Sequence, residues 1–193
     1  MGYRRPTVLN YWKQSWKLDP VWCPCDIELT ELIELRGIEN ATFFHFGTGE
    51  HHHVGIFCAD AGKRNSVLAI TASREEYASY VDLVIERPEV ARWYTAFFGD
   101  VYLLNPALLP PLDVATLFHL CEFRTGLTDD YGGLTDLELA RLLIDKLKPA
   151  GLLLFYEASA AFAKAAPIVE ELERLGLVVR DGAHKHLLVY RKA

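Results

Sequence analysis

The sequence predicts an α/β fold built on a doubly wound, mostly parallel sheet of seven strands that ends in an antiparallel hairpin. Short apolar runs alternate with amphipathic segments along most of the chain, which is the pattern of strands joined by helices. The last two apolar runs are joined by Asp181–Gly182, a dipeptide typical of hairpin turns. The length of 193 residues, 51% of them hydrophobic, suits one domain with a sizeable core.

The chain up to residue 71 is expected to contain two helices and the first two strands. Leucines and an isoleucine recur at three- and four-residue spacing over residues 29–36, which predicts a helix that Gly37 ends. The continuous apolar run ATFFHF (41–46) predicts a buried strand. A glycine turn and a helix over about residues 52–61 are expected next. SVLAIT (66–71) predicts the second strand.

The middle of the chain begins with a clear helix start. Ser73 is a favourable N-cap, and Glu76 follows at capping-box spacing, so a helix is expected over residues 73–86. WYTAFFG (93–99) predicts the third strand. After a proline-rich connection, LDVATLFHL (112–120) predicts the fourth. These apolar runs indicate strands buried on both faces.

The last third repeats the alternation. Thr135 is a second favourable N-cap and predicts a helix over residues 135–147. LLLFYE (152–157) predicts the fifth strand. Residues 160–175 are expected to form a helix in which Pro167 marks a kink or a boundary.

The final runs, GLVVR (176–180) and HKHLLVYRK (184–192), are expected to form the closing hairpin. In open α/β sheets, ligands bind beyond the carboxyl ends of the strands, where the strand order reverses. We therefore expect the first and fourth strands to flank the binding crevice.

Composition excludes several classes of function. A net charge of −6 repels phosphate backbones, so no nucleic-acid partner is expected. The N-terminus lacks the apolar region of a secretory signal, and no run approaches the roughly 18 apolar residues of a membrane helix. Cys23 and Cys25 lack the CxxC spacing of redox and zinc motifs. The cysteines are therefore interpreted as reduced thiols of a cytoplasmic protein.

Five segments occur in the order and on the elements expected of one known family. They are FHFGTGEHHH (44–53), GDVYLL (99–104), LDVATLFHL (112–120), LKPAGLLLFYE (147–157) and the final hairpin. Over residues 40–192 the chain resembles the class I S-adenosylmethionine-dependent methyltransferases. The resemblance implies a Rossmann-like fold, S-adenosylmethionine as cofactor and methyl transfer to a small-molecule nucleophile.

The resemblance also implies a cofactor-binding set. Its members lie in the turn after the first strand, at the end of the second strand and after the third: His45, Gly47, Thr48, Gly49, His51, Thr71, Asp100 and Val101. Asp100 is expected to accept a hydrogen bond from the adenine amino group. The family usually has acids where this chain has His45 and Thr71, the second acid holding the ribose hydroxyls. Glu75 or Glu76 in the next turn is expected to compensate.

Histidines are concentrated around the expected crevice. His45, His51, His52, His53 and His119 are candidates to converge there, with Cys121 and Glu122 close to His119 in sequence. Such residues can bind zinc or iron, and metal-dependent chemistry on a reused fold is one alternative function. Consecutive helical residues point about 100° apart, so the three adjacent histidines cannot face one ion. No metal is assigned, and His119, ahead of Glu122, is the expected catalytic base.

The N-terminal segment is rich in aromatic residues. One domain is expected over residues 1–193, with residues 1–40 serving as a lid, a packing segment or a dimer contact. As a lid, Tyr11, Trp12 and Trp16 are expected to bind substrate. Arg124, in the glycine-rich segment 123–133, either binds a substrate carboxylate or forms a surface ion pair. A third function left open is a non-catalytic binding protein.

Overall fold

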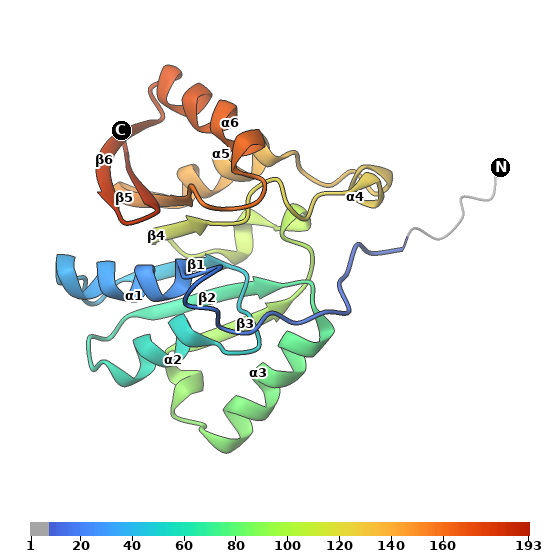
Figure 1. Ribbon diagram of the computed structural model, residues 1–193, viewed down its shortest axis with the longest axis vertical. Coiled ribbons are helices and arrows are strands. Elements are labelled where there is room, and N and C mark those ends of the chain that lie inside the picture. The colour runs from blue at the N-terminus through green and yellow to red at the C-terminus, as the bar shows by residue number, and fades with distance from the viewer. Residues whose placement is uncertain (1–7) are drawn as a thin grey trace.

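The computed structural model describes residues 8–193 and has a seven-stranded sheet at its centre (Figure 1). The strand order is β3-β2-β1-β4-β5-β7-β6. The strands are β1 (Thr42–Phe46), β2 (Ser66–Thr71), β3 (Tyr94–Phe98), β4 (Leu112–Leu117), β5 (Leu147–Tyr156), β6 (Val178–His184) and β7 (Leu187–Lys192). The first five strands pair in parallel, and β7 is antiparallel to both β5 and β6. This arrangement confirms the predicted fold class, with β1 and β4 adjacent at the reversal of strand order.

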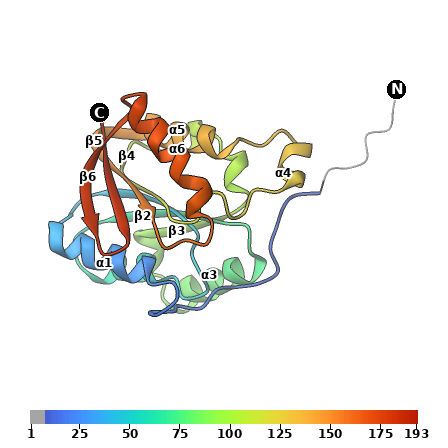
Figure 2. The ribbon, with the colours of Figure 1, turned by 45° about the horizontal axis from the view of Figure 1, so that its top comes forward.

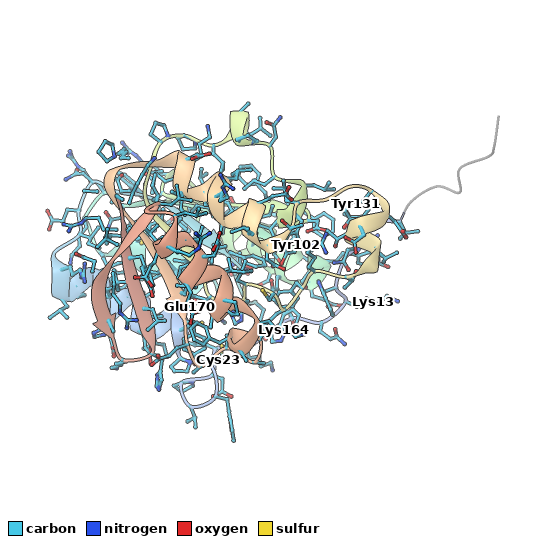
Figure 3. All side chains as sticks on the ribbon, turned by 90° about the horizontal axis from the view of Figure 1, so that it is seen from above. Lys13, Cys23, Tyr102, Tyr131, Lys164 and Glu170 are labelled. Carbon is cyan, nitrogen blue, oxygen red and sulfur yellow. The ribbon has the colours of Figure 1, made fainter. Side chains whose placement is uncertain are left out.

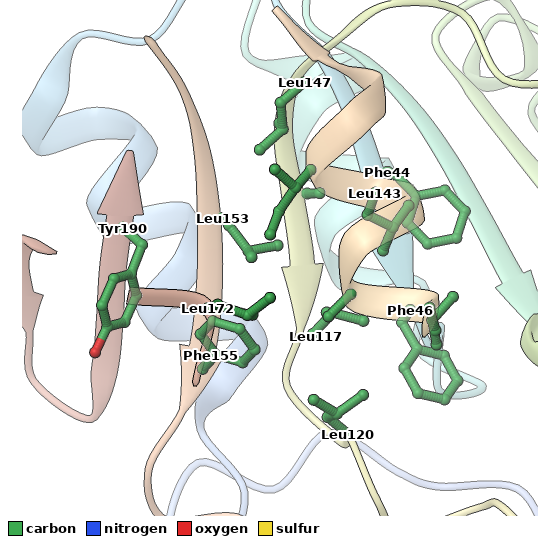
Figure 4. Close-up of a cluster of buried hydrophobic side chains, with 14 of the residues drawn as sticks. Phe44, Phe46, Leu117, Leu120, Leu143, Leu147, Leu153, Phe155, Leu172 and Tyr190 are labelled. Atoms are coloured by element: carbon green, nitrogen blue, oxygen red, sulfur yellow. The ribbon is translucent and has the colours of Figure 1, made fainter. Parts of the chain in front are cut away.

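Helices cover both faces of the sheet. They are α1 (Cys25–Arg36), α2 (His53–Asp60), α3 (Arg74–Glu86), α4 (Gly126–Asp130), α5 (Asp136–Lys146) and α6 (Phe162–Arg174), with short 3-10 turns at Val90–Arg92, Val101–Leu103 and Pro106–Leu108. One apolar cluster joins the sheet to α1 and α2, and the other joins it to α5 and α6. Figure 4 shows the second cluster, in which Phe44, Leu143 and Leu172 are almost completely buried. No helix in the described part of the chain is long and apolar enough to span a membrane.

Alternation along β1 decides which of its side chains face which layer. Phe44 and Phe46 belong to the cluster with α5, whereas Phe43 belongs to the cluster with α1. Successive side chains of a strand point to opposite faces, so His45 is on the α1 side with Phe43. This placement separates His45 from the cavity described below.

The predicted caps are present. Gly37 ends α1 with a φ of 60°, and the hydroxyls of Ser73 and Thr135 accept hydrogen bonds at the starts of α3 and α5. Two elements begin earlier than predicted, α1 at Cys25 and β5 at Leu147.

The closing hairpin turns at a different place from the one predicted. β6 continues through Asp181–Gly182 to His184, and the turn falls at Lys185–His186. Gly182, with a φ of 116°, lies at a register shift in β6, so the Asp–Gly dipeptide forms a bulge instead of the turn. Arg36 holds Asp181 in place through a 2.6 Å contact between its guanidinium and the carboxylate.

One further strand boundary is corrected. The fourth strand ends at Leu117 instead of residue 120, so His119 lies in the turn after it. The segment 123–133 contains the short helix α4, capped by Thr125. Pro167, predicted as a kink or a boundary, lies inside α6 and is not its boundary.

The N-terminal segment, residues 8–24, crosses the carboxyl ends of the strands before α1 begins (Figures 1 and 2). The amide of Trp12 donates to the carbonyl of Ala72, beyond β2, over 2.9 Å. The amide of Glu50, in the turn after β1, donates to the carbonyl of Trp16 over 2.9 Å. These bonds fix the segment over the predicted crevice; residues 1–7 of the predicted N-terminal segment lie outside the described residues.

Candidate functional site

A cavity of about 640 Å³ lies at the carboxyl ends of the parallel strands, under the N-terminal segment. Its volume falls in the range of small-molecule sites. Eleven of the residues singled out in the sequence line it: Trp12, Trp16, Gly47, Thr48, Gly49, His51, Thr71, Asp100, Val101, His119 and Glu122. Three others do not: Tyr11, His45 and Arg124.

The turn after β1 requires its glycines. Gly47 and Gly49 have φ values of 90° and 53°, a region that L side chains rarely adopt. A Cβ at Gly49 would lie 2.2 Å from Nε2 of His51 and 2.9 Å from the carbonyl oxygen of Trp16. Gly49 therefore lets the turn and the N-terminal segment approach each other closely.

Glu76 is a buried carboxylate in the cavity wall, only 3% exposed. It accepts hydrogen bonds from the hydroxyl of Thr71 at 2.6 Å and that of Thr48 at 3.2 Å. The backbone amide of Trp16 also donates to it, at 3.4 Å. Burial raises the pKa of Glu76 above its usual value, and these hydrogen bonds partly offset the effect. Glu75 and Glu76 are the two acids expected to replace the carboxylate that the family usually has at the position of Thr71. Glu76 lies in the cavity wall beside Thr71, whereas Glu75 is exposed.

Asp100 lies at the end of β3 in the cavity wall and is 6% exposed. Its Oδ1 accepts a hydrogen bond from the amide of Tyr102 at 3.0 Å, which makes it the cap of a short 3-10 turn. Its Oδ2 accepts a hydrogen bond from the hydroxyl of Tyr131. The sequence analysis did not single out Tyr131, which comes from the segment after α4.

His45 and His51 share a buried acid that sequence reasoning missed. Nε2 of His45 lies 3.4 Å from Oδ1 of Asp26, and Nε2 of His51 lies 3.9 Å from Oδ2. Nδ1 of His45 is 2.9 Å from the hydroxyl oxygen of Thr116 in β4. Burial raises the pKa of Asp26, but His45 and His51 outweigh it and keep that pKa below its usual value. Asp26 is an acid in the first turn of α1, the signal that could have drawn attention to it.

The five candidate histidines do not converge. His52 bonds through Nδ1 to the hydroxyl of Tyr94 at 2.8 Å, and Nε2 of His53 lies 3.3 Å from the hydroxyl of Thr30. Both rings therefore point into the packing between α2 and its neighbours. Of the five, His51 and His119 line the cavity.

Comparison with known proteins identifies the fold. No model of a known family matches the chain, and neither does any curated protein. A solved structure of a candidate caffeoyl-CoA O-methyltransferase from Staphylococcus aureus matches with a TM-score of 0.66 at 10% identity, covering 93% of this chain and 86% of that one. A SAM-dependent methyltransferase from Aquifex aeolicus matches with a TM-score of 0.58 at 19% identity, covering 91% and 98%.

The chain has the class I S-adenosylmethionine-dependent methyltransferase fold. At such low identities the likeness concerns the fold alone, and one fold hosts many activities. The [4+2]-cyclase SpnF also matches, with a TM-score of 0.51 at 20% identity over 74% of this chain. The chain spans about half the length of SpnF and of TrmN from Thermus thermophilus, 49% and 48% respectively.

One wall of the cavity in this methyltransferase fold carries two thiols and an imidazole. Sγ of Cys23 lies 3.7 Å from Sγ of Cys25, which lies 3.9 Å from Nε2 of His119. Nδ1 of His119 is 3.2 Å from Oε1 of Glu122, and the hydroxyl of Ser159 donates to the same oxygen at 2.5 Å.

These groups perturb one another's proton affinities. The hydrogen bond with Cys25 lowers the pKa of Cys23 to about 5. Burial lowers the pKa of His119, but its contacts with Cys23 and Glu122 outweigh burial and raise it to about 10. The wall therefore favours a thiolate beside a charged imidazolium.

Aromatic rings also line the cavity, next to His119, whose ring centroid lies 6.2 Å from that of Phe123. The ring centroids of Trp12 and Trp16 lie 5.2 and 5.6 Å from that of Phe123, in edge-to-face arrangements. Tyr11 instead lies under the guanidinium of Arg74, 4.8 Å from its ring centroid. Arg124 pairs with the carboxylate of Asp129, which matches the surface ion pair weighed as its alternative role.

Proposed function

We infer that this protein transfers a methyl group from S-adenosylmethionine to a small-molecule nucleophile. The observation that carries the proposal is the carboxylate of Glu76, held at the end of β2 by the hydroxyls of Thr71 and Thr48. It supplies an acid at the edge where the family's ribose-binding acid is expected, although the second strand itself ends in a threonine. The glycine turn after β1 and the acid after β3 lie in the same cavity.

The residues present fit this cofactor. Gly47 leaves space beside the turn that a side chain would fill, since a Cβ there would meet only the ring of His119, at 3.9 Å. Glu76 would accept hydrogen bonds from the ribose hydroxyls, and Asp100 from the adenine amino group. The cofactor, when bound, supplies a methyl group already activated by a sulfonium.

No covalent intermediate with the protein is required. The chain's own groups therefore only orient the acceptor, exclude water and take up a proton. The cavity walls orient the acceptor, and Trp12 and Trp16 exclude water from it. If the acceptor is a hydroxyl or a protonated amine, Nε2 of His119 takes up its proton after the imidazolium has passed its own proton to the Cys23 thiolate. The carboxylate of Glu122, 3.2 Å from Nδ1, balances the resulting charge.

A small acceptor fits the site better than a polymer. The N-terminal segment is bonded over the cavity at Ala72 and Glu50, which limits its mouth. The net charge of −6 disfavours a nucleic-acid acceptor. The four cysteines are free thiols, consistent with a reducing compartment such as the cytoplasm.

Binding and transfer can be tested separately. Calorimetry and thermal melts with S-adenosylmethionine and its demethylated product test binding; a 100-fold excess over Kd should raise the Tm by about 5–10 °C. Absence of binding of either compound at about 1 mM would reject the cofactor. Incubation of protein and methyl-labelled cofactor with cell extract then tests transfer. A labelled dialysable compound other than the cofactor that forms only when the protein is added supports a small acceptor, whereas protein-dependent label retained on protein or nucleic acid contradicts it.

A further inference from the structure

The wall formed by Cys23, Cys25 and His119 has a geometry that methyl transfer does not require. One ligand atom from each residue lies within 4.8 Å of the other two. Figure 3 shows Cys23 well apart from Tyr131, the residue that contacts Asp100. The cluster is therefore separated from the part of the cavity assigned to adenine, on the side left for the acceptor.

The distances match a tetrahedral ion. Zinc binds thiolate sulfur at about 2.3 Å and imidazole nitrogen at about 2.0–2.1 Å. Tetrahedral angles then place two sulfurs about 3.8 Å apart, and sulfur and nitrogen about 3.6 Å apart. The corresponding distances here are 3.7 Å between the sulfurs and 3.9 Å between Cys25 and His119. These two distances are within a few tenths of an ångström of the tetrahedral values, and the third pair, Cys23 and His119, lies within 4.8 Å, so the site closes on an ion with a shift of at most about 1 Å.

The ligands are held by separate parts of the fold. Pro24, the cap residue of α1, separates the cysteines and fixes its own φ, here −77°. Cys25 is buried at the start of α1, and His119 lies in the turn after β4. The reversal of strand order leaves β4 beside β1, and α1 packs over that region of the sheet. A site built this way requires little rearrangement on binding.

The surroundings of His119 also suit a metal ligand. A metal-bound imidazole usually donates its second ring N–H to a carboxylate, which fixes the ring orientation. Here Nδ1 of His119 has no hydrogen-bond partner among the described residues but lies 3.2 Å from Oε1 of Glu122, so a small turn of the ring would make that bond, and Ser159 in turn holds Glu122. Nε2 is thus the ring atom directed at the thiols.

We propose that Cys23, Cys25 and His119 bind one zinc-class divalent cation, with a fourth coordination position open to the cavity. All three residues line the cavity, and three protein ligands with an open position are typical of catalytic zinc sites. On binding, the thiol proton of Cys25 and the Nε2 proton of the His119 imidazolium pass to solvent as the sulfur–metal and nitrogen–metal bonds form. The open position would take water or the thiol or hydroxyl of an acceptor, whose proton loss the ion would promote.

This assignment deepens the proposed function without depending on it for its test. With the ion bound, Nε2 of His119 is a ligand, and proton loss by the acceptor is driven by coordination instead of by that nitrogen. The residues assigned to the cofactor are different ones, Glu76 and Asp100 among them. Metal binding and cofactor binding can therefore fail independently.

The test uses reduced, tag-free protein stripped of metal. Zn²⁺ is titrated against a chromophoric chelator, and Co²⁺ is used as a spectroscopic probe. We expect one equivalent of either ion and a thiolate-to-cobalt charge-transfer band. Cys23→Ser and His119→Gln should each weaken Zn²⁺ binding by more than about 100-fold, and Glu122→Gln by about 10–100-fold.

Matched variants exclude general effects of losing a thiol. Cys58→Ala and Cys121→Ser remove cysteines outside the cluster and should leave Zn²⁺ affinity within about twofold. Zn²⁺ should raise the Tm of the parent and of both controls but not that of Cys23→Ser. Because Cys23 is only partly buried, its variant should fold, as its own melt without metal will show.

Three results would overturn the proposal. One is the absence of stoichiometric Zn²⁺ binding by the reduced parent. Another is equal Zn²⁺ affinity of the parent and Cys23→Ser. The third is a Cys23–Cys25 disulfide that persists under the reducing conditions of the titration. In each case, measurable affinity for S-adenosylmethionine would show that the proposed cofactor site is correct even though the proposed metal site is not.

Discussion

Replacing Glu76 with Gln tests the acid that carries the proposed function. In the parent, the Glu76 carboxylate accepts hydrogen bonds from Thr71 and Thr48 and would accept further ones from ribose. Hydrogen bonds to a charged acceptor contribute about 1.5–3 kcal/mol, against about 0.5–1.5 kcal/mol for neutral ones. The variant should therefore lose about 1–2 kcal/mol of binding free energy, a 5–30-fold increase in Kd for S-adenosylmethionine. Calorimetry of both proteins measures this difference.

Glu76→Gln should stabilise the folded protein at neutral pH while it weakens binding of S-adenosylmethionine. Because burial raises the pKa of Glu76, the folded state holds this proton more tightly than the unfolded state. This group's contribution to stability is therefore present at low pH and is lost as pH rises from about 4.5 through the folded-state pKa. Glutamine does not titrate, so Glu76→Gln does not lose stability in this way as pH rises. The Tm of the variant relative to the parent should rise between pH 5 and pH 8.

The neighbouring Glu75→Gln is the matched control, since it removes the same charge from an exposed position on the same helix. It should leave the Kd within about twofold. Equal affinity of Glu76→Gln and Glu75→Gln for the cofactor would refute the role of Glu76. A large drop in the Tm of Glu76→Gln would instead show that the carboxylate serves the fold.

Two other substitutions, each paired with a control substitution, probe the cofactor side of the cavity. Asp100→Asn should weaken S-adenosylmethionine binding about 5–30-fold in calorimetry with little change in Tm, because the amide oxygen still accepts from Tyr102. Tyr131→Phe, which leaves the Asp100 carboxylate in place, should retain binding, and the reverse order of affinities would contradict the assignment. Gly49→Ala should lower the Tm more than Gly37→Ala in thermal melts. Both glycines have positive φ, but a Cβ meets close atoms only at Gly49, so equal losses would show that the close approach at Gly49 is unimportant.

The fold was predictable because its signals are local. The cap residues Ser73 and Thr135 and the apolar runs depend on neighbours in sequence, and the structure retains them. The prediction of a turn at Asp181–Gly182 was wrong because an Asp–Gly pair suits both a two-residue turn and a bulge. In the bulge, Asp181 pairs with the guanidinium of Arg36, 145 positions away in sequence. No local pattern contains that information.

The site could be predicted only where all the residues of a feature belong to one short segment of the sequence. The glycine turn and Asp100 belong to short motifs, and both line the cavity. His45 was assigned to the cofactor from its position before the glycines, but strand alternation turns it towards Asp26 on α1. The identity of a residue does not reveal which face of a strand it occupies when apolar residues fill both faces.

The cysteine–histidine cluster shows the limit of reading motifs along the chain. Cys23 and Cys25 do not match any common metal spacing, and their partner His119 is 94 positions from Cys25. They meet because the reversal of strand order puts β1 beside β4, while the N-terminal segment crosses the ends of both strands before entering α1. In this fold, the switch point gathers residues from segments that share no local pattern. The same crossing brings Trp12, Trp16 and Cys23 to the wall of the cavity, so one segment of 17 residues (8–24) supplies both aromatic rings and a thiol to a cavity built by the sheet.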